Sequence, residues 1–112
     1  MKKYAAFLDH NNKRQRVDRA IKSVLVHLQK HGLKTIMSCA GHRKNGWLAF
    51  ITFLPNEEFE KYVNESPWEL KIVNCYGITV VVRSQYRVSP EGYTKETRKQ
   101  FIKWLAMWRR EP

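Results

Sequence analysis

The apolar residues between positions 17 and 28 recur with the period of an α-helix. Four of them stand at i, i+4, i+7 and i+11: Val17, Ile21, Val24 and Leu28. This spacing gathers them on one face of a helix that must pack against other apolar residues. Gly32 follows at the place of a left-handed C-terminal cap. The pattern predicts an amphipathic helix from about Lys13 to His31.

Short apolar segments bounded by turn residues supply the rest of the fold. Four strands are predicted, at Lys34–Ser38, Trp47–Leu54, Glu69–Asn74 and Ile78–Ser84. Asn56 is a suitable N-cap for a short helix, and Thr94 is one for a last helix that ends near Arg109. The order α-β-β-α-β-β-α predicts an α/β (α+β) fold, with helices packed on an antiparallel or mixed sheet. At 112 residues, the chain is expected to form a single domain, 1–112.

Charge is the strongest global property of the chain. It carries 21 Lys and Arg against 10 Asp and Glu, a formal net charge of +11. A domain this basic is typical of proteins that bind a polyanion, of which nucleic acid is the commonest. No apolar run reaches the length of a membrane span, so we expect a cytoplasmic protein with no membrane contact. Its two cysteines, Cys39 and Cys75, are expected to be reduced.

The segment "MSCAGHRKNGW", residues 37–47, holds the densest group of reactive side chains. In one interpretation Cys39 is a nucleophile and His42 its base or a general acid, which makes both candidate catalytic residues. In a second, Cys39 and His42 bind zinc with Cys75 and a histidine such as His27 or His31. Structural zinc sites usually show two close ligand pairs and only one is present here, so no metal is predicted.

A phosphate-binding loop needs fewer coincidences than either alternative. Glycines let a loop bend until its N–H groups converge on an anion, while hydroxyl, imidazole and basic side chains add donors and charge. We therefore predict a ligand site made of Ser38, Cys39, Gly41, His42, Arg43, Lys44 and Trp47. An ordinary strand-to-strand connection with a polar tip stays open as the alternative.

Basic side chains on the predicted helices extend this site toward a polymeric ligand. We predict nucleic-acid contacts by Arg14, Arg16, Lys95, Lys99 and Lys103. Aromatic side chains supply stacking surfaces for bases, although most of them are needed in the core of a small domain. Tyr86 and Trp104 are the two candidates for an exposed ring, although packing in the core is the commoner outcome for each.

Three segments of the chain resemble a known family. "FLDHNNKRQRVDRAI", followed by "TIMSCAGH" and "GWLAFITF", resembles the N-terminal half of the wybutosine-pathway tRNA methyltransferases. The matching positions are Leu8, Asp9, Lys13, Asp18, Ser38, Cys39, Gly41 and Trp47. The "SC-x-G-H" loop is also similar to that of small phage and prophage proteins. The family's loop Arg is His42 here, and Ile51 and Thr52 replace its Ser-His pair.

The resemblance implies an α/β core whose loop faces RNA or a nucleotide, with S-adenosylmethionine as a cofactor implied by the resemblance alone. Taken with the charge, it predicts a nucleic-acid- or nucleotide-binding protein, with RNA as the leading ligand. Two alternatives stay open. The first is a methyltransferase-like, RNA-modifying enzyme, and the second is a phage-type protein that sequesters a nucleotide or inhibits a host protein. Whether the chain is an enzyme, and whether it forms a homo-oligomer, is left open.

Overall fold

A computed structural model describes residues 3–41, 49–68, 70–75, 79–84 and 95–109. The elements in chain order are β1 (Tyr4–Leu8), β2 (Arg14–Asp18), α1 (Arg19–Lys30), β3 (Thr35–Cys39), β4 (Phe50–Phe53), α2 (Glu57–Glu65), β5 (Leu70–Cys75), β6 (Thr79–Ser84) and α3 (Lys95–Ala106). The fold is α+β, as predicted, with two antiparallel sheets and three helices among the described residues. None of the described helices is long and apolar enough to cross a membrane.

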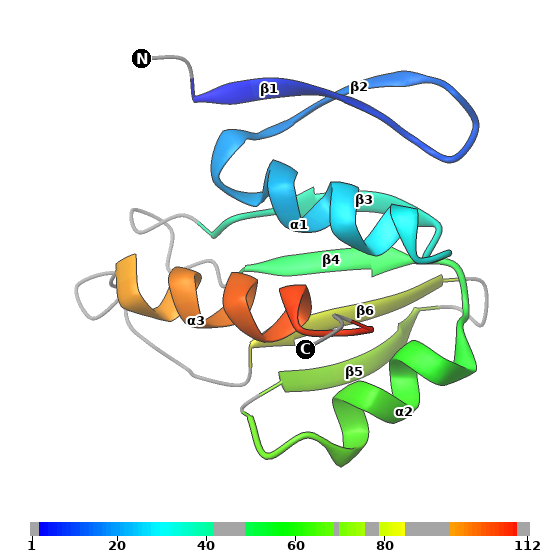
Figure 1. The fold of residues 1–112 in the computed structure, drawn as a ribbon, viewed down its shortest axis with the longest axis vertical. Helices are drawn as coiled ribbons and strands as arrows, with labels where there is room; N and C mark the ends of the chain where they lie inside the picture. The colour runs from blue at the N-terminus through cyan, green and yellow to red at the C-terminus, as the bar shows by residue number, and fades with distance from the viewer. Residues whose placement is uncertain (1–2, 42–48, 69, 76–78, 85–94, 110–112) are drawn as a thin grey trace.

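The larger sheet has the strand order β3-β4-β6-β5. Helices α1 and α3 lie across one side of it, and α2 lies beside β5 (Figure 1). Side chains from the strands and all three helices meet in one buried cluster, whose largest fully buried members are Phe53, Phe59, Phe101, Ile21, Leu25 and Leu28. The predicted helical stripe therefore faces the core, which is where burial of apolar surface stabilises a small domain most.

Local signals read from the sequence are confirmed at two helix ends. The Asn56 side chain accepts a hydrogen bond of 3.0 Å from the Phe59 N–H and so caps α2. Gly32 follows α1 and adopts φ 95°. A side chain at this position would have open space, so the positive φ, and not crowding, is the reason for a glycine here. The Leu33 N–H then bonds the Leu28 carbonyl at 3.0 Å, closing the helix end.

The start of the chain differs from the prediction. The expected helix from Lys13 begins only at Arg19, and two antiparallel strands, β1 and β2, precede it. The element order is thus ββαββαββα rather than α-β-β-α-β-β-α. Val17 fits the helical stripe in the sequence, yet in the structure it lies on β2, opposite Ala5, and packs on the core from there. Tertiary packing satisfies its burial equally well from a strand.

The ends of α1 and α3 are joined by side-chain contacts with backbone carbonyls. His27 donates through Nε2 to the Trp108 carbonyl at 2.6 Å, and Arg109 donates to the His31 carbonyl at 2.8 Å. Arg109 also pairs with Glu58 of α2. The rings of His27, in α1, and His31, just after it, pack together with 4.6 Å between their centroids, and His31 lies edge-on to Trp108. Because His27 is engaged in this way, the pair serves packing between helices.

Candidate functional site

The predicted phosphate loop begins at the end of β3. Ser38 is half-buried, Cys39 and Gly41 are buried, and Gly41 has φ 89°. The Ala40 N–H donates to the Asp18 carboxylate at 2.8 Å, and the Gly41 N–H contacts the Cys39 sulfur at 3.4 Å. Both of these N–H groups are thus engaged with protein acceptors. Four predicted members of the site, His42, Arg43, Lys44 and Trp47, lie outside the described residues.

Cys39 has the environment of an unactivated thiol. Burial raises its pKa above the ordinary value; the Gly41 N–H opposes this shift, and the negative charge of Asp18 adds to it. A thiol must ionise to attack, and an adjacent carboxylate disfavours that ionisation. The described surroundings of Cys39 therefore favour a structural role, with Asp18 bridging the start of α1 and the end of β3.

The predicted basic residues divide into two groups. Arg14 and Arg16 are exposed, but they lie on strand β2 and not on a helix as predicted. Lys99 and Lys103 are exposed on α3, and Lys95 is the first residue of that helix. Helix α1 lies between the hairpin and α3 (Figure 1), so the two groups are separate features of the surface.

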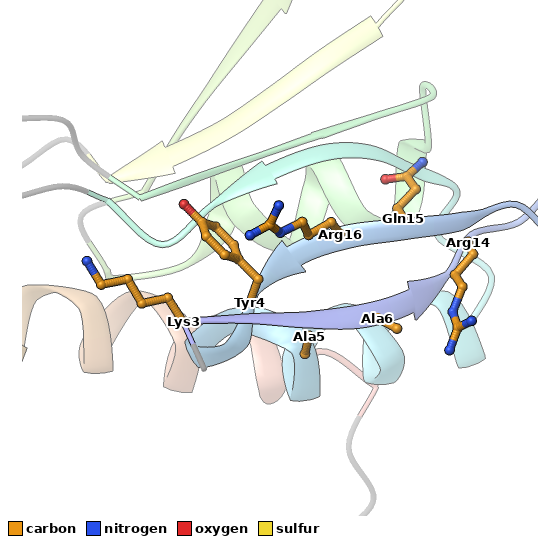
Figure 2. A pocket seen from close by; sticks show the side chains of 7 residues that line it. All are labelled: Lys3, Tyr4, Ala5, Ala6, Arg14, Gln15 and Arg16. Carbon is orange, nitrogen blue, oxygen red and sulfur yellow. The ribbon is translucent and has the colours of Figure 1, made fainter. Parts of the chain in front are cut away.

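The outer face of the β1–β2 hairpin brings Arg16 together with an aromatic ring. The Arg16 guanidinium carbon lies 4.2 Å from the centroid of the Tyr4 ring, a diagonal pair across the two strands. Figure 2 shows Lys3, Tyr4 and Arg16 beside one another, with Arg14 reaching to the other side of the strand. They line a hollow of about 600 Å³, completed by Ala5, Ala6 and Gln15. None of these seven residues is acidic.

Tyr4 was missed in the sequence because it precedes the first predicted element. It is 40% exposed, whereas Trp104, one of the two candidates for exposure, is partly buried and packs on the core. The Trp104 ring stacks on Trp68 with 5.9 Å between centroids, and its carbonyl accepts a 2.7 Å bond from the Tyr62 hydroxyl. Tyr86 lies outside the described residues. The signal that could have identified Tyr4 is its position one hairpin turn away from two alternating arginines.

A buried carboxylate holds the turn of this hairpin. Asp9 accepts hydrogen bonds from the Asn11 N–H at 2.8 Å, the Lys13 N–H at 2.9 Å and the Gln15 side-chain amide at 2.7 Å. Asn12 takes the left-handed conformation, with φ 61°, that the turn requires. Asp9 thus holds the turn that sets the β1–β2 register, in which Arg16 lies diagonal to Tyr4.

We predict that acid loosens this turn before it affects the core. The Lys13 N–H bond holds the pKa of Asp9 below its ordinary value of 3.8, assisted by Asn11 and Gln15. A lowered folded-state pKa contributes stability that is present above the ordinary value and is lost as the pH falls through the folded one. The amide resonances of Asn11 and Lys13, followed by NMR from neutral pH to below pH ~3, should shift in that window. In Asp9→Asn that titration should be absent; its persistence would assign the effect to another group.

Neither a metal site nor a similarity to known proteins narrows the function further. Among the described residues, no group of three or more His, Cys, Asp or Glu side chains is arranged to hold a metal ion. The chain matches no protein-family model, no curated protein and no solved structure.

Proposed function

We propose that this protein binds RNA, and that the outer face of the β1–β2 hairpin is part of the binding surface. The observation that carries the proposal is the Tyr4–Arg16 pair, flanked by Lys3 and Arg14 in a hollow lined by no acidic described residue. Proteins that bind single-stranded nucleic acid combine cations for the phosphates with aromatic platforms for the bases. Both components lie here within one short hairpin.

The geometry favours an unpaired strand over a duplex. Base stacking requires a ring face or a guanidinium plane that a base can reach, and bases within a duplex are already stacked on their neighbours. Tyr4 is partly exposed and Arg16 lies over its ring, so a base can stack on the guanidinium or replace it. The net charge of +11 adds a field that attracts any polyanion but does not select among them.

The loop at Ser38–Lys44 stays the proposed second contact. The family resemblance suggests that the RNA is a tRNA, and His42, Arg43 and Lys44 would then bring donors and charge beyond the buried start of the loop. Because the N–H groups of Ala40 and Gly41 already contact acceptors within the protein, the side chains of this loop, more than its backbone, would contact the phosphates. Lys99 and Lys103 would extend the contact only for a ligand long enough to pass α1.

The test separates stacking from charge by their salt dependence. Fluorescence anisotropy with labelled single-stranded RNA, tRNA and duplex DNA is measured across a salt series. For single-stranded RNA, Tyr4→Ala should cost about 1–3 kcal/mol with the salt slope unchanged, since it removes a stacked base. Arg14→Ala should reduce the slope by about 0.7, the value of one phosphate contact. Tyr4→Phe, which keeps the ring, should bind like the unmodified protein.

Lys61→Ala provides the matched control. Lys61 is an exposed cation on α2, at the opposite end of the molecule from the hairpin (Figure 1). Its loss changes the net charge as Arg14→Ala does but should leave the slope nearly intact. Two outcomes would contradict the proposal. In the first, Lys61→Ala and Arg14→Ala change the salt slope equally; in the second, all three nucleic acids bind equally and binding vanishes at physiological salt. Either would mean that the net positive charge alone causes the binding.

A further inference from the structure

A second hollow, of about 770 Å³, lies between strand β1 and helix α1. Ala6, Phe7 and Leu8 form its strand side, and Lys22, Val26, Gln29 and Lys30 form its helix side, with Arg14 reaching in from β2. The helix residues follow at intervals of four, three and one, which places them on one flank of α1 beside its buried face. The hollow is therefore a groove that runs along an edge strand.

The backbone of β1 is open toward this groove. The Arg19 N–H donates to the Lys3 carbonyl and the Asp9 N–H donates to the Lys13 carbonyl, both at 2.9 Å. Hydrogen-bonded pairs alternate along an antiparallel ladder, so the odd-numbered residues of β1 bond β2, while Tyr4, Ala6 and Leu8 turn their N–H and C=O groups outward. Edge strands of this kind pair readily with another chain unless something covers them.

The side chain of Gln29 bonds one of these outward groups, but its own amide oxygen is left unpaired in the described part of the chain. Its Nε2 donates to the Leu8 carbonyl at 2.7 Å. Its Oε1 is buried and has no hydrogen-bond partner among the described residues. A buried acceptor without a donor is unfavourable. The Leu8 carbonyl is already bonded, so main-chain pairing with an added strand is left to Tyr4 and Ala6, and the Gln29 oxygen is a further acceptor beside it.

The walls of the groove specify the kind of chain that fits. Leu8 and Val26 are large apolar side chains that are 54% and 47% exposed, and Arg14, Lys22 and Lys30 supply positive charge. None of the described residues that line the groove is acidic. An occupant that complements both features has acidic and apolar side chains in alternation. A second copy of this chain would bring the same basic edge, and with a net charge of +11 on each copy the two would repel.

We propose that this groove binds an extended acidic segment of a partner protein, which adds to β1 as a third strand. Main-chain hydrogen bonds to Tyr4 and Ala6 provide affinity, and the apolar and basic walls select the sequence. This inference does not depend on RNA binding: it uses the edge of β1 and the flank of α1, although Ala6 and Arg14 line both hollows.

The test begins with a displayed library of short random peptides, selected against the whole protein. Enriched peptides should alternate Asp or Glu with apolar residues. One such peptide is labelled and its affinity measured by anisotropy. Ala6→Pro should weaken it by about tenfold or more, since proline removes the outward N–H while leaving the β1–β2 ladder bonds in place. Ala6→Val keeps that N–H and should stay within about threefold, the matched control.

Two further measurements keep the proposal testable if Ala6→Pro does not fold. Lys22→Glu combined with Lys30→Glu should weaken the peptide by about tenfold or more, and the bound peptide should slow amide hydrogen exchange at Ala6. Enriched peptides without acidic residues, or peptides indifferent to these variants, would overturn it. The proposal would also be overturned if no peptide is enriched and the Lys22→Glu/Lys30→Glu variant loses affinity for RNA, because the groove would then be part of the RNA-binding surface.

Discussion

Replacing Phe59 by alanine is expected to lower the free energy of unfolding by about 3–5 kcal/mol. Phe59 is fully buried, and its ring lies edge-on to Phe53 and to Trp108, with 5.0 Å between centroids in both pairs. Phe59 is therefore the side chain at which α2, strand β4 of the larger sheet and the turn after α3 meet. Alanine there leaves a cavity that three separate elements would have to move to fill.

Urea denaturation followed by far-ultraviolet circular dichroism measures this change. Phe59→Leu is the control, since it keeps most of the apolar volume and should lose roughly half as much stability. Glu57→Ala, at an exposed position two residues earlier in α2, should change stability by less than ~1 kcal/mol. If Phe59→Ala costs no more than that exposed substitution, the three elements do not depend on one another at this point.

Asp18→Ala is expected to lower the free energy of unfolding by about 1.5–3 kcal/mol, the range for a hydrogen bond to a charged group. Asp18 stands at the N-cap position of α1 but makes no side-chain cap there. Its carboxylate instead accepts the Ala40 N–H at 2.8 Å, which attaches the end of β3 to the beginning of the helix. Loss of this bond frees the start of the 38–44 loop from the core.

The thiol of Cys39 reports the same substitution independently. Asp18 raises the pKa of that thiol further, beyond the effect of burial, so Asp18→Asn should increase its rate of reaction with iodoacetamide at a given pH. Asp18→Asn retains an acceptor oxygen and should also keep most of the stability. Both variants are measured with Cys75 replaced by serine, so that a single thiol reacts. An unchanged alkylation rate in Asp18→Asn would show that its charge does not influence Cys39.

The parts of the fold that could be predicted depend on local rules. The Asn56 cap, the Gly32 helix end and the pairing of β5 with β6 each follow from a few adjacent residues. The hairpin of β1 and β2 could not be predicted this way, because Val17 satisfies a helical stripe and a strand equally well. The turn signal was present, since Asp9 precedes two asparagines and Asn12 accepts a positive φ, but only the tertiary contacts of Phe7 and Val17 decide in favour of strands.

Only the two arginines of the candidate site were predicted from the sequence, and neither their placement nor Tyr4 was. Arg14 and Arg16 were identified from their charge, and they are exposed as expected, although on a strand. The pairing of β2 with β1 is what sets Arg16 against Tyr4, while the Arg14 side chain reaches to the other side of the strand (Figure 2). Asp9 and Asp18 matched the family resemblance, yet their described roles are hydrogen bonds to backbone N–H groups. The Asp9 bonds are local to the turn, but Asp18 and Ala40 are 22 residues apart and meet only through the fold, so no sequence pattern indicates their bond.

The strand order of the larger sheet also determines how the chain can assemble during synthesis. β6 is made after β4 and β5 but lies between them. Until β6 leaves the ribosome, β5 therefore has no sheet neighbour and β4 pairs with β3 alone. The β5–β6 hairpin forms from local contacts and joins β4 as one piece. Until it does, the edge of β4 is open to pairing with other nascent chains. A fragment that stops before Thr79 would keep that edge open permanently and should aggregate.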